Sequence, residues 1–81
     1  MRAKIENKTI SINLSEDEVL VLFEWLQNFN QEKRPTLFQD QAEERILFDL
    51  EAELEKIVSG TFEGNYQEIL SKARKGIRDV E

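Results

Sequence analysis

The sequence contains no cysteine and no histidine among its 81 residues. The absence of cysteine excludes disulfides, thiolate catalysis and cysteine metal sites, and it argues against a small secreted disulfide scaffold. The absence of histidine removes the usual zinc sites and every nucleophile that relies on a histidine base. We therefore predict no catalytic, cofactor-binding or metal-binding residues, and we do not expect an enzyme.

Proline, glycine and long apolar runs are also scarce. With one proline and three glycines, the composition is not that of a disordered chain. No segment approaches the roughly 20 apolar residues of a membrane span, and residues 1–15 hold no apolar stretch that could act as a signal peptide. The length suits one small domain, residues 1–81. These features predict a single cytoplasmic domain with a modest core.

Charge is distributed unevenly along the chain. The formal net charge is −6, of which residues 1–14 carry +2, residues 15–58 carry −8 and residues 59–81 are balanced. The excess of negative charge repels a phosphate backbone. Nucleic acid and membranes are therefore not the expected partners.

The N-terminal segment, about residues 4–14, alternates apolar and polar side chains. Ile10, Ile12 and Leu14 share one face, which is the period of a half-buried strand. Ile5 is out of phase with this set. Two arrangements fit: a tight turn at Asn7-Lys8 that makes a short hairpin, or a single strand that pairs with a second chain, because a lone strand leaves its backbone groups unpaired.

Three amphipathic helices are predicted to follow the β segment. Each start carries a capping pair three residues apart, namely Ser15 with Glu18, Asp40 with Glu43, and Asn65 with Glu68. The apolar residues that follow recur at three and four positions, which gives helices over about 16–29, 41–58 and 66–79. Pro35 separates the first two helices, and Ser59-Gly60 is expected to end the second. The fold class is mostly α, with an α+β organisation.

Some apolar side chains lie outside the regular stripes. Leu20, Val21 and Trp25 lie off the main stripe of the first helix, and Phe48 lies off that of the second. They fit either a core packed under the β segment or a surface that meets another chain, since Trp and Phe dominate buried contact patches. Under the second interpretation we predict an interface at Val21, Trp25 and Phe48, with a protein partner or a homodimer.

The carboxylates of the second helix and the basic residues of the third are best explained by helix structure and not by a binding site. Carboxylates four residues apart on the second helix, such as Glu51 and Glu55, fit a solvated face better than a metal site, because one convex helix supplies too few converging oxygens. The basic group Lys72, Arg74, Lys75 and Arg78 complements the dipole at the end of the third helix.

The stretch from Ile10 to Leu20, a short strand that runs directly into a capped helix, resembles the opening of ribbon-helix-helix proteins. The resemblance implies paired strands from two chains, with Thr9, Ser11 and Asn13 facing the DNA bases. The chain departs from that family after about twenty residues, because a Pro35 loop and a long acidic helix replace its short second helix. A dimeric DNA-binding or antitoxin-type regulator is therefore the alternative function.

Over most of its length the chain resembles a family of short bacterial proteins without a known activity. The segments that carry the resemblance are residues 14–18, 38–44 and 50–55. It implies a bacterial cytoplasmic protein that acts as a separate chain. Because interaction is the only function class that the residues support, we predict a protein-interaction or adaptor module without catalytic activity.

Overall fold

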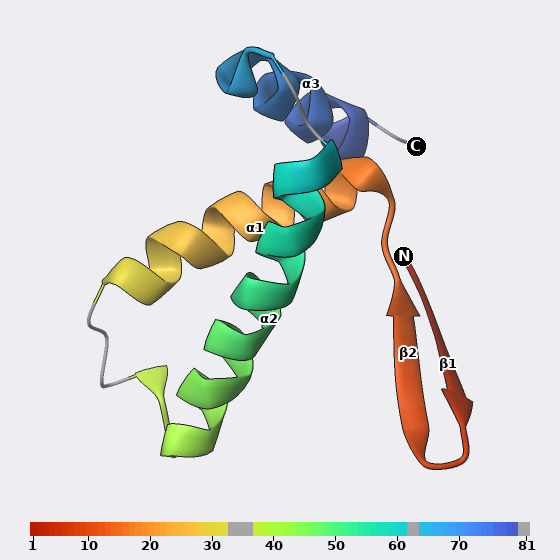
Figure 1. The fold of residues 1–81 in the computed structure, drawn as a ribbon, viewed down its shortest axis with the longest axis vertical. Helices are drawn as coiled ribbons and strands as arrows, with labels where there is room; N and C mark the ends of the chain where they lie inside the picture. Colours follow the sequence, from red (N-terminus) through yellow and green to blue (C-terminus); the bar gives the residue numbers. More distant parts are fainter. Residues whose placement is uncertain (33–36, 62–63, 80–81) are drawn as a thin grey trace.

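The computed structural model describes residues 1–32, 37–61 and 64–79. Two strands, β1 (Arg2–Glu6) and β2 (Thr9–Asn13), precede three helices, α1 (Glu16–Gln31), α2 (Gln41–Thr61) and α3 (Tyr66–Arg78). Figure 1 shows the strands standing beside the helices, with their turn at the end of the molecule opposite α3. The predicted fold class is confirmed.

The N-terminal segment is a hairpin, so the first of the two predicted arrangements is correct. β1 and β2 pair antiparallel, with Ile5 opposite Ile10 and Ala3 opposite Ile12. The turn residues Asn7 and Lys8 both have positive φ, 50° and 68°, which is the geometry of a two-residue type I′ turn. This turn explains why Ile5 is out of phase in the sequence, because the chain reverses between Ile5 and Ile10.

Each helix begins at its predicted capping residue. At α1 the Ser15 hydroxyl accepts from the Glu18 backbone N–H at 3.2 Å, and the Glu18 carboxylate accepts from the Ser15 N–H at 2.8 Å. At α2 the Asp40 carboxylate accepts from the Ala42 N–H at 2.8 Å. At α3 the Asn65 side-chain oxygen accepts from the N–H groups of Gln67 and Glu68. These bonds satisfy backbone donors that the helices themselves leave unpaired.

Two helices run further than predicted. α1 extends to Gln31, and the Glu32 N–H donates to the Phe29 carbonyl at its end. α2 passes through the expected stop at Ser59-Gly60 and reaches Thr61. Gly60 stays within the helix, because a helix tolerates a glycine at modest cost. The glycine with a positive φ is Gly64, at 99°, a backbone geometry that glycine adopts readily. Pro35 lies outside the described residues.

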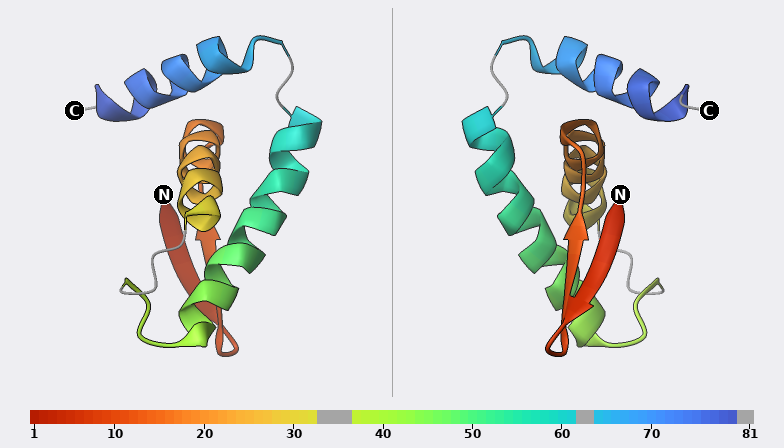
Figure 2. Two further views of the ribbon diagram at one scale, coloured as in Figure 1. Left: turned by 90° about the vertical axis from the view of Figure 1, so that its left-hand side faces the viewer. Right: turned by 90° about the vertical axis from the view of Figure 1, so that its right-hand side faces the viewer.

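The core is built around α1, which is buried on two sides as its wide apolar surface suggests. α2 and α3 each pack on α1, and within the described ranges they do not pack on each other. Figure 2 shows α1 almost end-on, with α3 above it and α2 to one side. Eight apolar residues form the buried cluster: Val19, Leu20, Phe23, Leu26, Leu54, Val58, Leu70 and Ala73.

The contact between α1 and α3 is close at one glycine. A Cβ atom at Gly76 would lie 2.7 Å from a carboxylate oxygen of Asp17, so the missing side chain leaves room for the start of α1. Among the helices of the described residues, none is long and apolar enough to cross a lipid bilayer.

Candidate interaction surface

The hairpin has one apolar side, and that side is exposed. The register places Ala3, Ile5, Ile10 and Ile12 on the same side of the two strands, because side chains alternate along each strand. Ile5 is 71 % exposed, Ile10 65 % and Ile12 57 %. Neither strand packs on any helix of the described chain. The half-buried strand predicted from the alternation is therefore uncovered in this chain.

An apolar groove lies between the base of the hairpin and the helices, with a volume of about 510 Å³. Ile12 lines the hairpin wall, Leu22 belongs to α1, and Leu50 and Ile57 form the α2 wall. Leu50 is only partly buried and Ile57 is 49 % exposed. The predicted stripe of α2 is thus wider than its contact with α1: Leu54 and Val58 are buried, whereas Ile57 and the 64 % exposed Ile46 remain at the surface.

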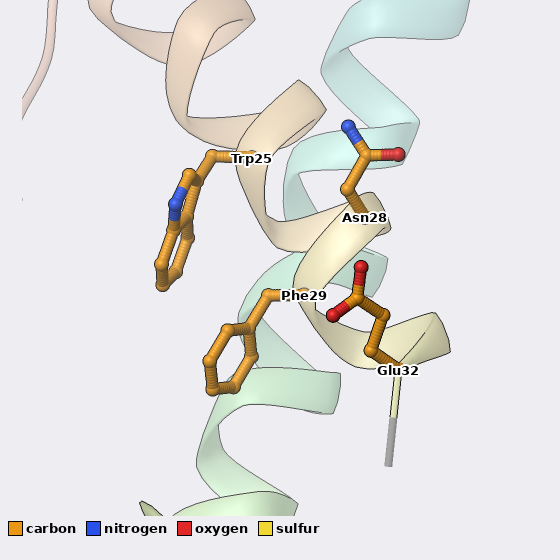
Figure 3. Close-up of a pocket in the computed structure, with 4 residues that line it drawn as sticks. All are labelled: Trp25, Asn28, Phe29 and Glu32. Carbon is orange, nitrogen blue, oxygen red and sulfur yellow. The ribbon is translucent and has the colours of Figure 1, made fainter. Parts of the chain in front are cut away.

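An aromatic cluster continues this surface along α1. Trp25 stacks on Phe29, with ring centroids 4.8 Å apart and planes at 18°. Phe38 contacts Phe29 edge to face, with ring centroids 5.9 Å apart. Figure 3 shows the Trp25 and Phe29 rings projecting from the same side of α1, where they line a hollow of about 320 Å³ together with Asn28 and Glu32. Leu22, Trp25 and Phe29 recur at helical spacing, so the cluster lies on the groove side of α1.

We call these parts together the open face. It consists of the apolar side of the hairpin, the groove, and the Trp25–Phe29 pair.

The three residues predicted at an interface do not form one site. Trp25 lies in the open face and is 55 % exposed. Val21 is partly buried and packs against the core cluster. Phe48 is 44 % exposed but lines a different hollow near the start of α2, beside Asp40 and Arg45. The structure therefore retains Trp25 as the central candidate and separates it from Phe48.

Two described side chains, Glu18 and Tyr66, have shifted pKa values. The Ser15 backbone N–H that donates to the Glu18 carboxylate, and then the N-terminal ammonium at 3.2 Å, hold the pKa of Glu18 below its usual value. On the other side of α1, burial raises the pKa of Tyr66, and the nearby Glu24 carboxylate raises it further. Among the described residues, the buried phenol oxygen of Tyr66 has no partner at normal hydrogen-bond geometry, and Glu24 acts on it mainly through its charge.

The acidic residues of α2 do not converge. Asp49 pairs with Arg45 at 3.4 Å and Glu53 pairs with Lys56 at 2.7 Å, all on an exposed helix surface. Across the described ranges, no three acidic side chains gather closely enough to hold a metal ion. The basic residues of α3 are likewise exposed on its outer surface. Absence of metal binding and of catalysis both stay predictions.

The open face was only partly visible in the sequence. A two-residue turn at Asn7-Lys8 would have paired Ile5 with Ile10 and so predicted the apolar side of the hairpin. Phe29 and Phe38 carried no such signal, because their contact joins α1 to a segment beyond the loop. The groove depends on how the hairpin and α2 are placed, which local patterns do not determine.

Comparison of the chain with protein-family models, with curated proteins and with solved structures finds no match. The resemblances to ribbon-helix-helix proteins and to short bacterial proteins therefore stay predictions. In this chain β2 has β1 beside it, whereas the ribbon-helix-helix resemblance implies strands paired between chains.

Proposed function

We propose that this chain is a small cytoplasmic protein-interaction module, without catalytic activity, that binds protein through its open face. The observation that carries the proposal is an apolar groove walled by the hairpin and α2, with exposed isoleucines on both walls. Contiguous apolar surface of this kind on a small protein marks an interaction site or a ligand groove. The lack of cysteine and histidine supports the cytoplasmic, non-catalytic part of the proposal.

Trp25 is the residue through which the proposal is best tested. Large aromatic side chains supply most of the binding energy at protein interfaces when a partner covers them. At 55 % exposure Trp25 is outside the core cluster, so a charge at this position should not enter the protein interior. The expected cost of Trp25→Glu therefore falls on binding and not on folding.

The experiment compares tagged wild-type protein with Trp25→Glu and with Gln67→Glu. Gln67 is exposed on α3, away from the open face, and its replacement makes the same change in net charge. Circular dichroism should show the same helical content and nearly the same melting temperature in all three. Each protein is then recovered from cells, and any chain that accompanies it in stoichiometric amount, of its own kind or another, is identified and titrated in pure form.

The proposal predicts a complex that wild type and Gln67→Glu form and that Trp25→Glu loses. If all three proteins form the same complexes, or none forms a stoichiometric complex, the open face is not a protein-binding surface. If Trp25→Glu is unfolded, Trp25 belongs to the core and the proposal fails on that ground.

A further inference from the structure

We infer that the partner which covers the open face is a second copy of this chain, in a two-fold dimer that buries the apolar side of both hairpins. This inference rests on the proposed function and names its partner. Three observations carry it: the isolated position of the hairpin, the excess surface of the single chain, and the complementary charge of the hairpin and α2.

The hairpin lacks the support that a two-stranded sheet needs. An isolated hairpin is at best marginally stable in water, and a third strand or a packed surface is required to hold it. Here neither strand packs on a helix of the described chain, and Lys8, a residue with a Cβ, occupies a positive-φ turn position that glycine adopts more readily. A surface that covers Ile5 and Ile10 would supply the missing support.

The single chain also exposes more surface than a compact protein of its size. Its accessible surface is 6847 Å², whereas a compact monomer of 9.5 kDa exposes about 5,000 Å². Its radius of gyration is 14.3 Å, against about 11.7 Å for a compact chain of this length. The excess of about 1,800 Å² per chain exceeds the roughly 800 Å² per partner of a standard interface. A dimer that buried this area on both chains would fall within the roughly 2,000–5,000 Å² in total of obligate homodimers.

Charge favours a second copy as the partner. Residues 1–14 carry a net charge of +2, with basic side chains at Arg2, Lys4 and Lys8, and α2 carries −4. Arg2 and Lys4 lie on the polar side of the strands, opposite the isoleucines, so they add a long-range attraction between the hairpin and α2 of another copy without entering the apolar contact. The apolar contact itself would join the isoleucines of the hairpin to Ile46, Leu50 and Ile57 of that helix. A two-fold interface repeats every such contact, so one chain supplies both complementary surfaces.

The test uses two neighbouring positions on opposite sides of β2. Ile10 lies on the apolar side and Ser11 on the polar side, and both are exposed in the single chain. Wild type, Ile10→Glu and Ser11→Glu are compared by sedimentation velocity over a wide range of concentration, and circular dichroism measures their helical content. Because the buried cluster contains no hairpin residue, both variants should keep their helices.

We expect wild type and Ser11→Glu to sediment at twice the mass of the chain at micromolar concentration. Ile10→Glu should dimerise at least about 100-fold more weakly, since two isoleucines per dimer lose their burial. Ile10→Glu could also weaken the dimer by unfolding the hairpin, so two variants that keep the β-branched shape serve as controls. Ile10→Val should dimerise like wild type. The dimerisation affinity of Ile10→Thr should fall between those of Ile10→Val and Ile10→Glu.

A wild-type chain that stays monomeric throughout overturns the inference, and so does a dimer that Ile10→Glu leaves intact or that Ser11→Glu weakens equally. These outcomes leave the proposed function standing if Trp25 still governs binding of a different protein. The two failures are therefore distinguishable.

Discussion

The side-chain amide of Asn30 donates to the Glu51 carboxylate at 2.7 Å and to the Leu47 carbonyl at 3.3 Å, and so joins the last turn of α1 to the middle of α2. Both side chains are partly buried. A hydrogen bond to a charged acceptor stabilises a folded protein more than one to a neutral acceptor. Removal of the donor leaves the partly buried acceptor unsatisfied, which costs further free energy. This contact helps to fix the angle between two helices whose apolar contact is short.

Replacing Asn30 by aspartate should make stability depend on pH. The new carboxylate would face that of Glu51, and two adjacent carboxylates resist joint ionisation, so the folded protein would bind a proton more tightly than the unfolded chain. The free energy of unfolding of Asn30→Asp should therefore fall relative to wild type as pH rises through about 4 to 6, by roughly 1–3 kcal/mol in total.

Asn30→Ala is the control for this pair, because it removes the hydrogen bond without adding charge. Urea denaturation at several pH values measures both variants. A constant difference between Asn30→Asp and wild type across this pH range would show that Asn30 and Glu51 are not in contact in solution.

Two leucines of α2 line the groove and differ in burial. Leu54 is 5 % exposed, so Leu54→Ala should lower the free energy of unfolding by about 2–5 kcal/mol. Leu50 lines the groove and is only partly buried, so Leu50→Ala should cost less, about 1–2 kcal/mol, in the monomer. Thermal or urea unfolding at low protein concentration measures this. Equal losses at the two positions would mean that the groove is filled within the single chain.

The sequence predicted the helices well because their signals are local. Ser15, Asp40 and Asn65 cap the helices as predicted, since a capping bond joins residues only two or three positions apart. Helical spacing assigns Leu50 and Leu54 alike to the core; Leu54 is buried, whereas Leu50 is only partly buried and packs against the core cluster. Both lie on the same apolar stripe, and only the position of α1 decides which part of the stripe is covered.

The capping box of α1 gives stability its own dependence on pH. The bond from the Ser15 N–H lowers the pKa of Glu18 below its ordinary value of 4.5. A lowered folded-state pKa contributes stability that is present above the ordinary value and is lost as pH falls through the lowered one. The advantage of wild type over Glu18→Gln should therefore be present at pH 7 and shrink below about pH 4.

Ser15→Ala supplies the companion variant, because it removes the hydroxyl acceptor and leaves Glu18 charged. It should lower the free energy of unfolding by about 0.5–2 kcal/mol. Chemical denaturation at pH 7 and pH 3 measures both. An advantage over Glu18→Gln that is as large at pH 3 as at pH 7 would show that the Glu18 charge plays no part.

The candidate site was less predictable than the helices. Trp25 was identified because it lies off the apolar stripe of its own helix, which is a local property. The predicted neighbour Phe48 was chosen by the same criterion on α2, but that criterion does not say on which side of α2 a residue lies relative to α1. Phe29 lies one turn after Trp25 in α1 and is the residue on which Trp25 stacks.

The central claim, that the open face is covered by a second copy of the chain, is tested most directly by the accessibility of Trp25 in solution. It is the one tryptophan of the sequence, so its fluorescence reports on this face alone. Acrylamide quenching is measured in wild type and in Ile10→Glu from nanomolar to high micromolar concentration. We predict that quenching of wild type weakens and its emission shifts to shorter wavelength as concentration rises, while Ile10→Glu stays strongly quenched. Quenching of wild type that is strong and independent of concentration would contradict the claim.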